Sequence, residues 1–194
     1  MSDLEVSAPQ NARAAVVLVH GHEASKDWGF FPWLAERFCD SRIAVARFTM
    51  SGDSYATHVR EVGEVVDHLQ SHYRHLPVFL LGHSLGGAIS LMTASESDGL
   101  AGVITWSAIT RGEGIDLLDY TPRVGVPLLA IHGSKDASVG VDDSRRIVDG
   151  ANNASLLVID GASHTYDAIH PLVYIPRALE YATAVSACFI RAYA

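Results

Sequence analysis

The chain has 194 residues, 48% of them hydrophobic and 19% charged, a balance that predicts one globular domain over residues 1–194. A net charge of −8 without a basic cluster argues against nucleic acid and anionic lipid surfaces as partners. The apolar runs are too short for a membrane span, and the first residues lack the pattern of a secretory signal. Cys39 and Cys188 have no metal-site spacing, so we expect reduced thiols in a cytoplasmic protein.

Six short apolar runs, rich in Val, Ile and Leu, recur along the chain without alternating polar residues. They occupy 14–21, 43–48, 77–82, 102–108, 127–133 and 155–161. Runs of this kind are typical of parallel strands that are buried on both faces.

Helical patterns lie between these runs. In 58–74, apolar residues follow a spacing of three and four, and 84–97 is rich in Ala, Leu, Ile and Met. The segment 177–193 opens after Pro176, a residue suited to the first turn of a helix. The alternation predicts a three-layer α/β fold with a mostly parallel sheet of about six strands.

The sequence "LLGHSLGGA" (80–88) stands where the third strand meets the following helix. It contains the pattern G-x-S-x-G, with Gly82 and Gly86 two residues either side of Ser84. In such a turn the serine is held in a strained conformation above the strand end, and the glycines allow close backbone approach. The stretch lacks the Lys-Ser/Thr of a phosphate-binding loop, so Ser84 is predicted to be a nucleophile.

A serine nucleophile needs a base and a residue that orients the base. Asp136 follows the strand at 127–133, and His164 follows the strand at 155–161. All three residues therefore lie at the carboxyl ends of strands, where open α/β sheets bind ligands. Asp160 and Asp167 are rival acids and are ranked below Asp136.

The backbone N–H groups of Leu85 and His22 are the expected oxyanion donors, because one follows the nucleophile and the other follows the first strand. His20 is expected to shape that loop. His22 and Glu23 have no third ligand at a useful spacing, so we expect neither a metal nor a cofactor.

With these residues in place, the chain resembles the α/β-hydrolase superfamily over about residues 14–192. The segments "KDWGFFPWLAERF" (26–38) and "TWSAI" (105–109) are similar to small dienelactone-hydrolase-like and prolyl-oligopeptidase-like serine esterases. The resemblance implies hydrolysis of esters through an acyl-enzyme, without a cofactor.

Two features depart from these relatives. Dienelactone hydrolases proper use a cysteine nucleophile, whereas this chain has Ser84. Relatives also tend to carry extra N-terminal strands and an inserted cap, but here the connection 109–126 leaves room for one short helix at 114–120. We therefore expect a minimal fold without a lid domain.

An open site suits small esters, and Trp28, Trp106 and Tyr166 are the expected walls of the substrate pocket. Phe30 and Phe31 are expected in the core. The predicted function is a serine hydrolase of small carboxylic esters. A thioesterase or peptidase with the same residues, and a non-catalytic binding protein of this fold, remain alternatives.

Overall fold

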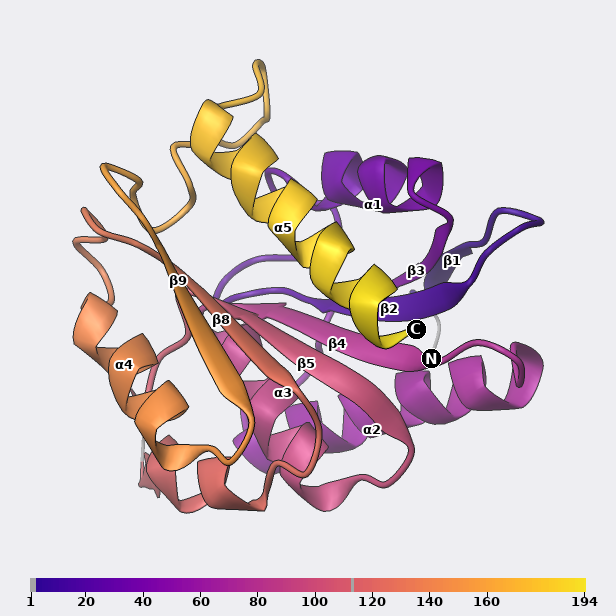
Figure 1. The fold of residues 1–194 in the computed structure, drawn as a ribbon, viewed down its shortest axis with the longest axis horizontal. Helices are drawn as coiled ribbons and strands as arrows, with labels where there is room; N and C mark the ends of the chain where they lie inside the picture. The colour runs from indigo at the N-terminus through magenta and orange to yellow at the C-terminus, as the bar shows by residue number, and fades with distance from the viewer. Residues whose placement is uncertain (1–2, 113) are drawn as a thin grey trace.

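The computed structural model describes residues 3–112 and 114–194, and its central element is a seven-stranded sheet with the order β1-β3-β2-β4-β5-β8-β9 (Figure 1). The six strands from β3 to β9 in this order run parallel, which confirms the predicted sheet. Their bounds are β2 Ala14–Val19, β3 Ile43–Arg47, β4 Val78–His83, β5 Leu100–Trp106, β8 Leu128–Gly133 and β9 Ala154–Ile159.

The seventh strand, β1 (Glu5–Ser7), was not among the predicted strands and pairs antiparallel with β3. An ion pair supports it, because the Arg47 guanidinium contacts Glu5 at 2.6 Å and Asp27 at 3.1 Å. The prediction that all strands are buried on both faces is also wrong for β9, which lies at the sheet edge and leaves Val158 36% exposed.

Helices cover both faces of the sheet (Figure 1). They are α1 Phe31–Asp40, α2 Tyr55–His72, α3 Leu85–Glu96, α4 Val141–Gly150 and α5 Arg177–Tyr193. Ser54 caps the start of α2, since its hydroxyl accepts the N–H of Thr57, while α1 has a proline in its first turn.

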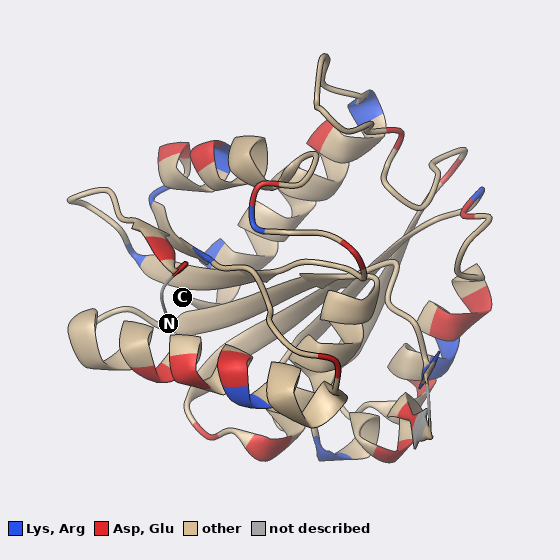
Figure 2. Ribbon diagram, turned by 180° about the vertical axis from the view of Figure 1, so that it is seen from behind, with Lys and Arg blue, Asp and Glu red and all other residues tan. Residues whose placement is uncertain are grey.

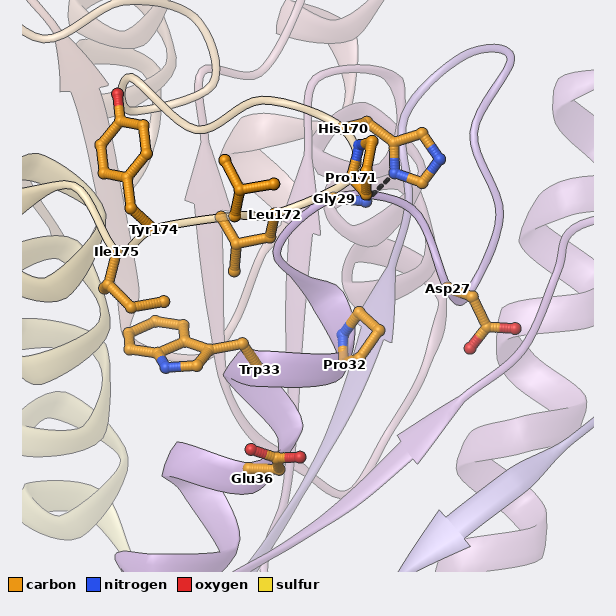
Figure 3. A pocket seen from close by; sticks show the side chains of 11 residues that line it. Asp27, Gly29, Pro32, Trp33, Glu36, His170, Pro171, Leu172, Tyr174 and Ile175 are labelled. Atoms are coloured by element: carbon orange, nitrogen blue, oxygen red, sulfur yellow. Dashed lines mark hydrogen bonds between the residues drawn. The ribbon is translucent and has the colours of Figure 1, made fainter.

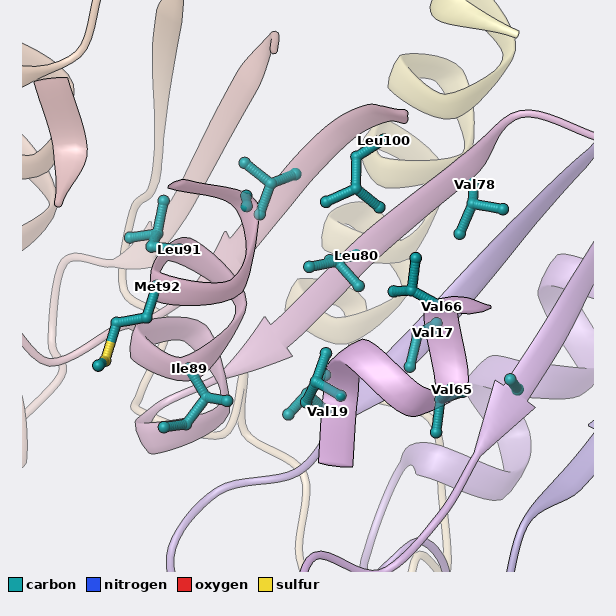
Figure 4. Close-up of a cluster of buried hydrophobic side chains, with 14 of the residues drawn as sticks. Val17, Val19, Val65, Val66, Val78, Leu80, Ile89, Leu91, Met92 and Leu100 are labelled. Atoms are coloured by element: carbon teal, nitrogen blue, oxygen red, sulfur yellow. The ribbon is translucent and has the colours of Figure 1, made fainter. Parts of the chain in front are cut away.

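Successive strand residues point to opposite faces and so divide the core in two. Val17 and Val19 of β2 pack with residues of α2 and α3 (Figure 4), and Ile147 of α4 belongs to the same cluster. Val16 and Leu18 pack on the other face with α1 and α5. Acidic residues outnumber basic ones and lie mainly on the outer helices and loops (Figure 2).

The connection between β5 and β8 holds only short elements. A hairpin of two-residue strands, β6 Arg111–Gly112 and β7 Ile115–Asp116, precedes two short 3₁₀ turns, Leu117–Asp119 and Thr121–Arg123. The expected helix at 114–120 is thus reduced to one 3₁₀ turn. Within the described residues of this connection, no segment is long enough to form a helical cap.

Candidate active site

Ser84 lies at the sharp turn between β4 and α3, with φ 55° and ψ −118°. A non-glycine residue at positive φ is uncommon and strained, so surrounding contacts must hold it there. Its N–H donates to the carbonyl of Trp106 at 2.8 Å. A Cβ on Gly82 would lie 2.0 Å from the Gly86 carbonyl oxygen, and one on Gly86 would lie 2.2 Å from that of Val19. The glycines therefore permit the close backbone packing that fixes Ser84.

Asp136 and His164 come from the loops after β8 and β9 and meet directly. His164 Nδ1 donates to Asp136 Oδ2 at 2.7 Å. The Asp136 side chain is fully buried, and its other oxygen, Oδ1, accepts the N–H groups of Ser138 and Val139 at 2.9 and 2.8 Å. Burial alone would raise the pKa of Asp136, but these donors and His164 outweigh it and lower that pKa. The carboxylate is thus ionised and points at one ring nitrogen.

The rival acids have other partners. Asp160 accepts the Ser134 hydroxyl at 3.0 Å, and Asp167 accepts the N–H of Ser163 at 3.1 Å. Neither contact involves His164, so Asp136 is the carboxylate that the structure places on the histidine.

Two cavities meet at Ser84. The His164 cavity, of about 370 Å³, is lined by Gly21, His22, Glu23, Ala24, Trp28, His83, Ser84, His164 and Thr165. The Tyr55 cavity, of about 510 Å³, is lined by His22, Gly52, Asp53, Tyr55, His58, Ser84, Leu85, Ile109 and Gly112. Ser84 and His22 line both cavities, whereas His164 and Trp28 line the first and Leu85 lines the second.

The structure corrects the expectation for two of the three pocket residues. Trp106 and Tyr166 are fully buried in the core formed with α1 and α5, and their rings contact each other with centroids 5.0 Å apart. The Tyr166 hydroxyl donates to the Ile131 carbonyl at 2.9 Å, which satisfies its polar end inside the protein. Phe30 and Phe31 are buried as predicted.

A third hollow lies between α1 and the segment 170–175 and has a volume of about 480 Å³ (Figure 3). His170 lines this hollow, where its ring stacks on Trp28 of the His164 cavity and its Nδ1 accepts the N–H of Gly29 at 2.9 Å. This hollow lacks Ser84, Asp136 and His164 among its lining residues. The chemistry is therefore assigned to the two cavities that meet at Ser84.

Two histidines hold the loops of the site. His20 accepts the N–H of Met50 through Nε2 and donates from Nδ1 to the Gly21 carbonyl, which supports its expected loop-shaping role. His83, which sequence reasoning did not single out, donates from Nε2 to the His164 carbonyl at 2.9 Å. Burial lowers the pKa of His83 to about 4.

The protein is expected to lose stability as the pH falls from 6.5 to 4, because of His83. In this range the unfolded chain binds a proton that the folded protein excludes, so the free energy of unfolding falls by about 3 kcal/mol in total. Denaturant unfolding from pH 7.5 to 4.5 should show a shallower decline for His83→Gln, which keeps a donor but does not titrate. His22→Gln, at a side chain 78% exposed, should decline like the wild type. Equal slopes for all three proteins would contradict the prediction.

His22 Nε2 and Glu23 Oε1 lie 3.9 Å apart on an exposed loop. Among residues 3–112 and 114–194, no group of three His, Cys, Asp or Glu side chains is arranged to hold a metal ion. In the same ranges, no helix combines the length and the apolar character that crossing a membrane requires.

Comparisons with known proteins agree with this fold. Human monoglyceride lipase is 52% identical over 52 residues, which is 26% of this chain and 17% of that protein. Phospholipase YtpA of Bacillus subtilis is 29% identical over 164 residues, or 75% of this chain and 61% of the relative. The chain thus spans less than two thirds of these curated relatives. The solved dienelactone hydrolase of Anabaena variabilis superposes with a TM-score of 0.84 at 19% identity, covering 98% of this chain and 91% of that one.

The model of the hydrolase family described as serine aminopeptidase S33 matches residues 10–115. The matched segment is more than half of the chain and includes β2, β3, β4 and the turn at Ser84. Together with the sheet order, this match shows that the chain belongs to the serine aminopeptidase S33 family of the α/β-hydrolase superfamily.

Proposed function

We propose that this protein is a serine hydrolase that cleaves small carboxylic esters through an acyl-enzyme. The observation that carries the proposal is the 2.7 Å hydrogen bond from His164 to Asp136, on a histidine that lines one cavity with Ser84. The names of the relatives, monoglyceride lipase and phospholipase, support ester bonds as the substrate.

In the first half of the reaction, Ser84 Oγ attacks the ester carbonyl carbon while Nε2 of His164 takes its proton. Nδ1 of His164 donates to Asp136, so Nε2 is the nitrogen left to accept. The N–H groups of Leu85 and His22 stabilise the negative oxygen, assisted by the N-terminus of α3. His164 then gives its proton to the departing alcohol, and the acyl group stays on Ser84.

In the second half, His164 takes a proton from water as the water oxygen attacks the acyl carbon. The tetrahedral intermediate collapses, the carboxylic acid leaves, and Ser84 Oγ regains its proton from His164. Both halves use the same donors, and neither needs a cofactor.

The two cavities suit the two parts of an ester. His164 must protonate the alcohol, so the alcohol part lies in the His164 cavity beside Trp28 and Thr165. The acyl part then extends into the Tyr55 cavity, past Leu85 and Ile109.

Chain-length preference is expected to stop growing after a few carbons. Each buried methylene contributes about 0.8 kcal/mol, but the described residues of the short connection between β5 and β8 form no cap that could cover a long acyl chain. Values of kcat/KM for p-nitrophenyl esters should be highest between acetate and hexanoate and fall steeply towards palmitate. The rate should not jump at the solubility limit of the substrate. A preference for C12–C16 esters over butyrate would contradict the open site.

Covalent labelling tests the function directly. A fluorophosphonate should form a bond between Ser84 Oγ and phosphorus with loss of fluoride, and peptide mass spectrometry should locate the adduct at Ser84. The wild type should also hydrolyse p-nitrophenyl butyrate, and the label should abolish that activity in proportion to its occupancy. Hydrolysis that persists in fully labelled protein, or a label on another residue, would refute the proposal.

A further inference from the structure

His132 is a fully buried histidine at the end of β8 that the proposed mechanism leaves without a task. Its neighbours on the strand are apolar, so the polar ring must find its partners inside the protein. Nε2 lies 3.2 Å from Asp136 Oδ2 and 3.0 Å from the carbonyl oxygen of Val139. A carbonyl oxygen and an ionised carboxylate can only accept hydrogen bonds. Nε2 must therefore carry the ring proton.

The other ring nitrogen is held by α4. His132 Nδ1 lies 2.7 Å from Ser144 Oγ, and Ser144 is fully buried. In the neutral ring Nδ1 accepts, so the Ser144 hydroxyl donates to it and keeps the proton on Nε2. Helix α4 thus determines which side of the ring faces Asp136.

Three hydrogen bonds hold Asp136: Oδ1 accepts the N–H groups of Ser138 and Val139, and Oδ2 accepts Nδ1 of His164. His132 Nε2 lies 3.2 Å from Oδ2, but its hydrogen bond goes to the carbonyl of Val139, the residue whose own N–H holds Oδ1. The Asp136 side chain is fully buried, so these three donors replace the water that an exposed carboxylate would bind. Without His132, the Val139 carbonyl would lose its hydrogen bond, and no ring N–H would lie near Oδ2 besides that of His164.

We propose that His132, oriented by Ser144, is a positioning residue: by binding the Val139 carbonyl it fixes the loop that holds Asp136 against His164, and its nearby N–H offsets part of the carboxylate charge. The inference rests on the proposed function. It differs from a purely structural role because it predicts changes in catalysis that exceed any loss of folded protein.

The test compares His132→Leu, which removes the donor, with His132→Gln, which restores an N–H near the position of Nε2. His132→Leu should lower kcat by about 10- to 100-fold through misplacement of the acid and base, with KM within about twofold of wild type. His132→Gln should recover most of that loss. Activities are expressed per fluorophosphonate-reactive Ser84, so a loss of folded protein does not count.

The pH profile gives the second readout. The titratable groups around His164 include Asp136, the His83 ring, whose centroid is 4.8 Å away, and His22 and Glu23, which line the same cavity. In His132→Leu, Asp136 carries more uncompensated negative charge, so the protonated form of the base is stabilised. The rising limb of kcat/KM should therefore move to higher pH in this variant and return in His132→Gln. Thr183→Val, which removes a buried hydroxyl on α5, should change stability without moving the limb.

Ser144→Ala keeps the imidazole ring and replaces His132→Leu as the test variant if His132→Leu fails to fold. It should lower kcat several-fold and move the rising limb of the kcat/KM pH profile to higher pH. A Ser144→Ala protein with wild-type kcat and pH profile overturns the proposal, and so does equal impairment of folded His132→Leu and His132→Gln. Failure of the proposed function is distinguishable, because wild-type protein would then neither label at Ser84 nor hydrolyse esters.

Discussion

Ser84→Ala is expected to lower kcat/KM for short-chain esters by about 10⁴-fold or more while the protein folds normally. The substitution removes the nucleophilic oxygen but leaves the backbone hydrogen bond to Trp106 and the glycine contacts that define the turn. Only substrate binding and the oxyanion donors then remain to assist attack by water. Initial rates on p-nitrophenyl butyrate, with circular dichroism to confirm folding, measure the effect.

Ser95→Ala is the matched control. Ser95 lies near the opposite end of α3, where its hydroxyl donates to the Met92 carbonyl at 2.8 Å. This variant should keep near wild-type activity. If Ser84→Ala also keeps it, another residue supplies the nucleophile.

Asp136→Asn is expected to reduce kcat by about 10³- to 10⁴-fold. The two backbone donors at Oδ1 require the amide oxygen at that position, which turns the amide NH₂ towards His164. His164 Nδ1 must then accept a hydrogen bond, so the proton moves to Nε2, and Nε2 can no longer take the proton of Ser84. Steady-state kinetics of the purified variant, checked for folding, measure this loss.

Asp160→Asn and Asp167→Asn provide the comparison, since their carboxylates accept from Ser134 and Ser163 instead. Both should retain activity within a few-fold of wild type. If Asp160→Asn or Asp167→Asn lowers kcat by about 10³-fold or more while Asp136→Asn does not, Asp136 is not the acid that orients the base.

The parallel sheet and the turn at Ser84 could be predicted because their signals are local. Buried parallel strands are continuous apolar runs, and the turn needs glycines at fixed offsets from the serine. The positions of Asp136 and His164 followed from strand ends alone, since parallel strands deliver their carboxyl ends to one edge.

The features that were missed depend on contacts between distant segments. Strand β1 is three residues long, too short for a periodic signal, and exists through pairing with β3. Whether Trp106 faces the site or the core depends on how the strand is packed against α1 and α5, which apolar composition does not reveal. For His83 and His132, the available signal was a histidine in an otherwise apolar strand, one residue before Ser84 and four residues before Asp136.

The glycines beside Ser84 also restrict how this chain can change over evolution. A side chain at Gly82 or Gly86 would collide first with carbonyl groups, which no substitution elsewhere can shorten. At Gly102, by contrast, an added Cβ would meet the rings of Phe79 and Phe189 at 3.0 and 3.1 Å, and smaller residues there would make room. A substitution of Gly102 can therefore be compensated by a second mutation, whereas a substitution of Gly82 or Gly86 cannot. Descendants of this chain can repack the sheet but must inherit Gly82 and Gly86 unchanged.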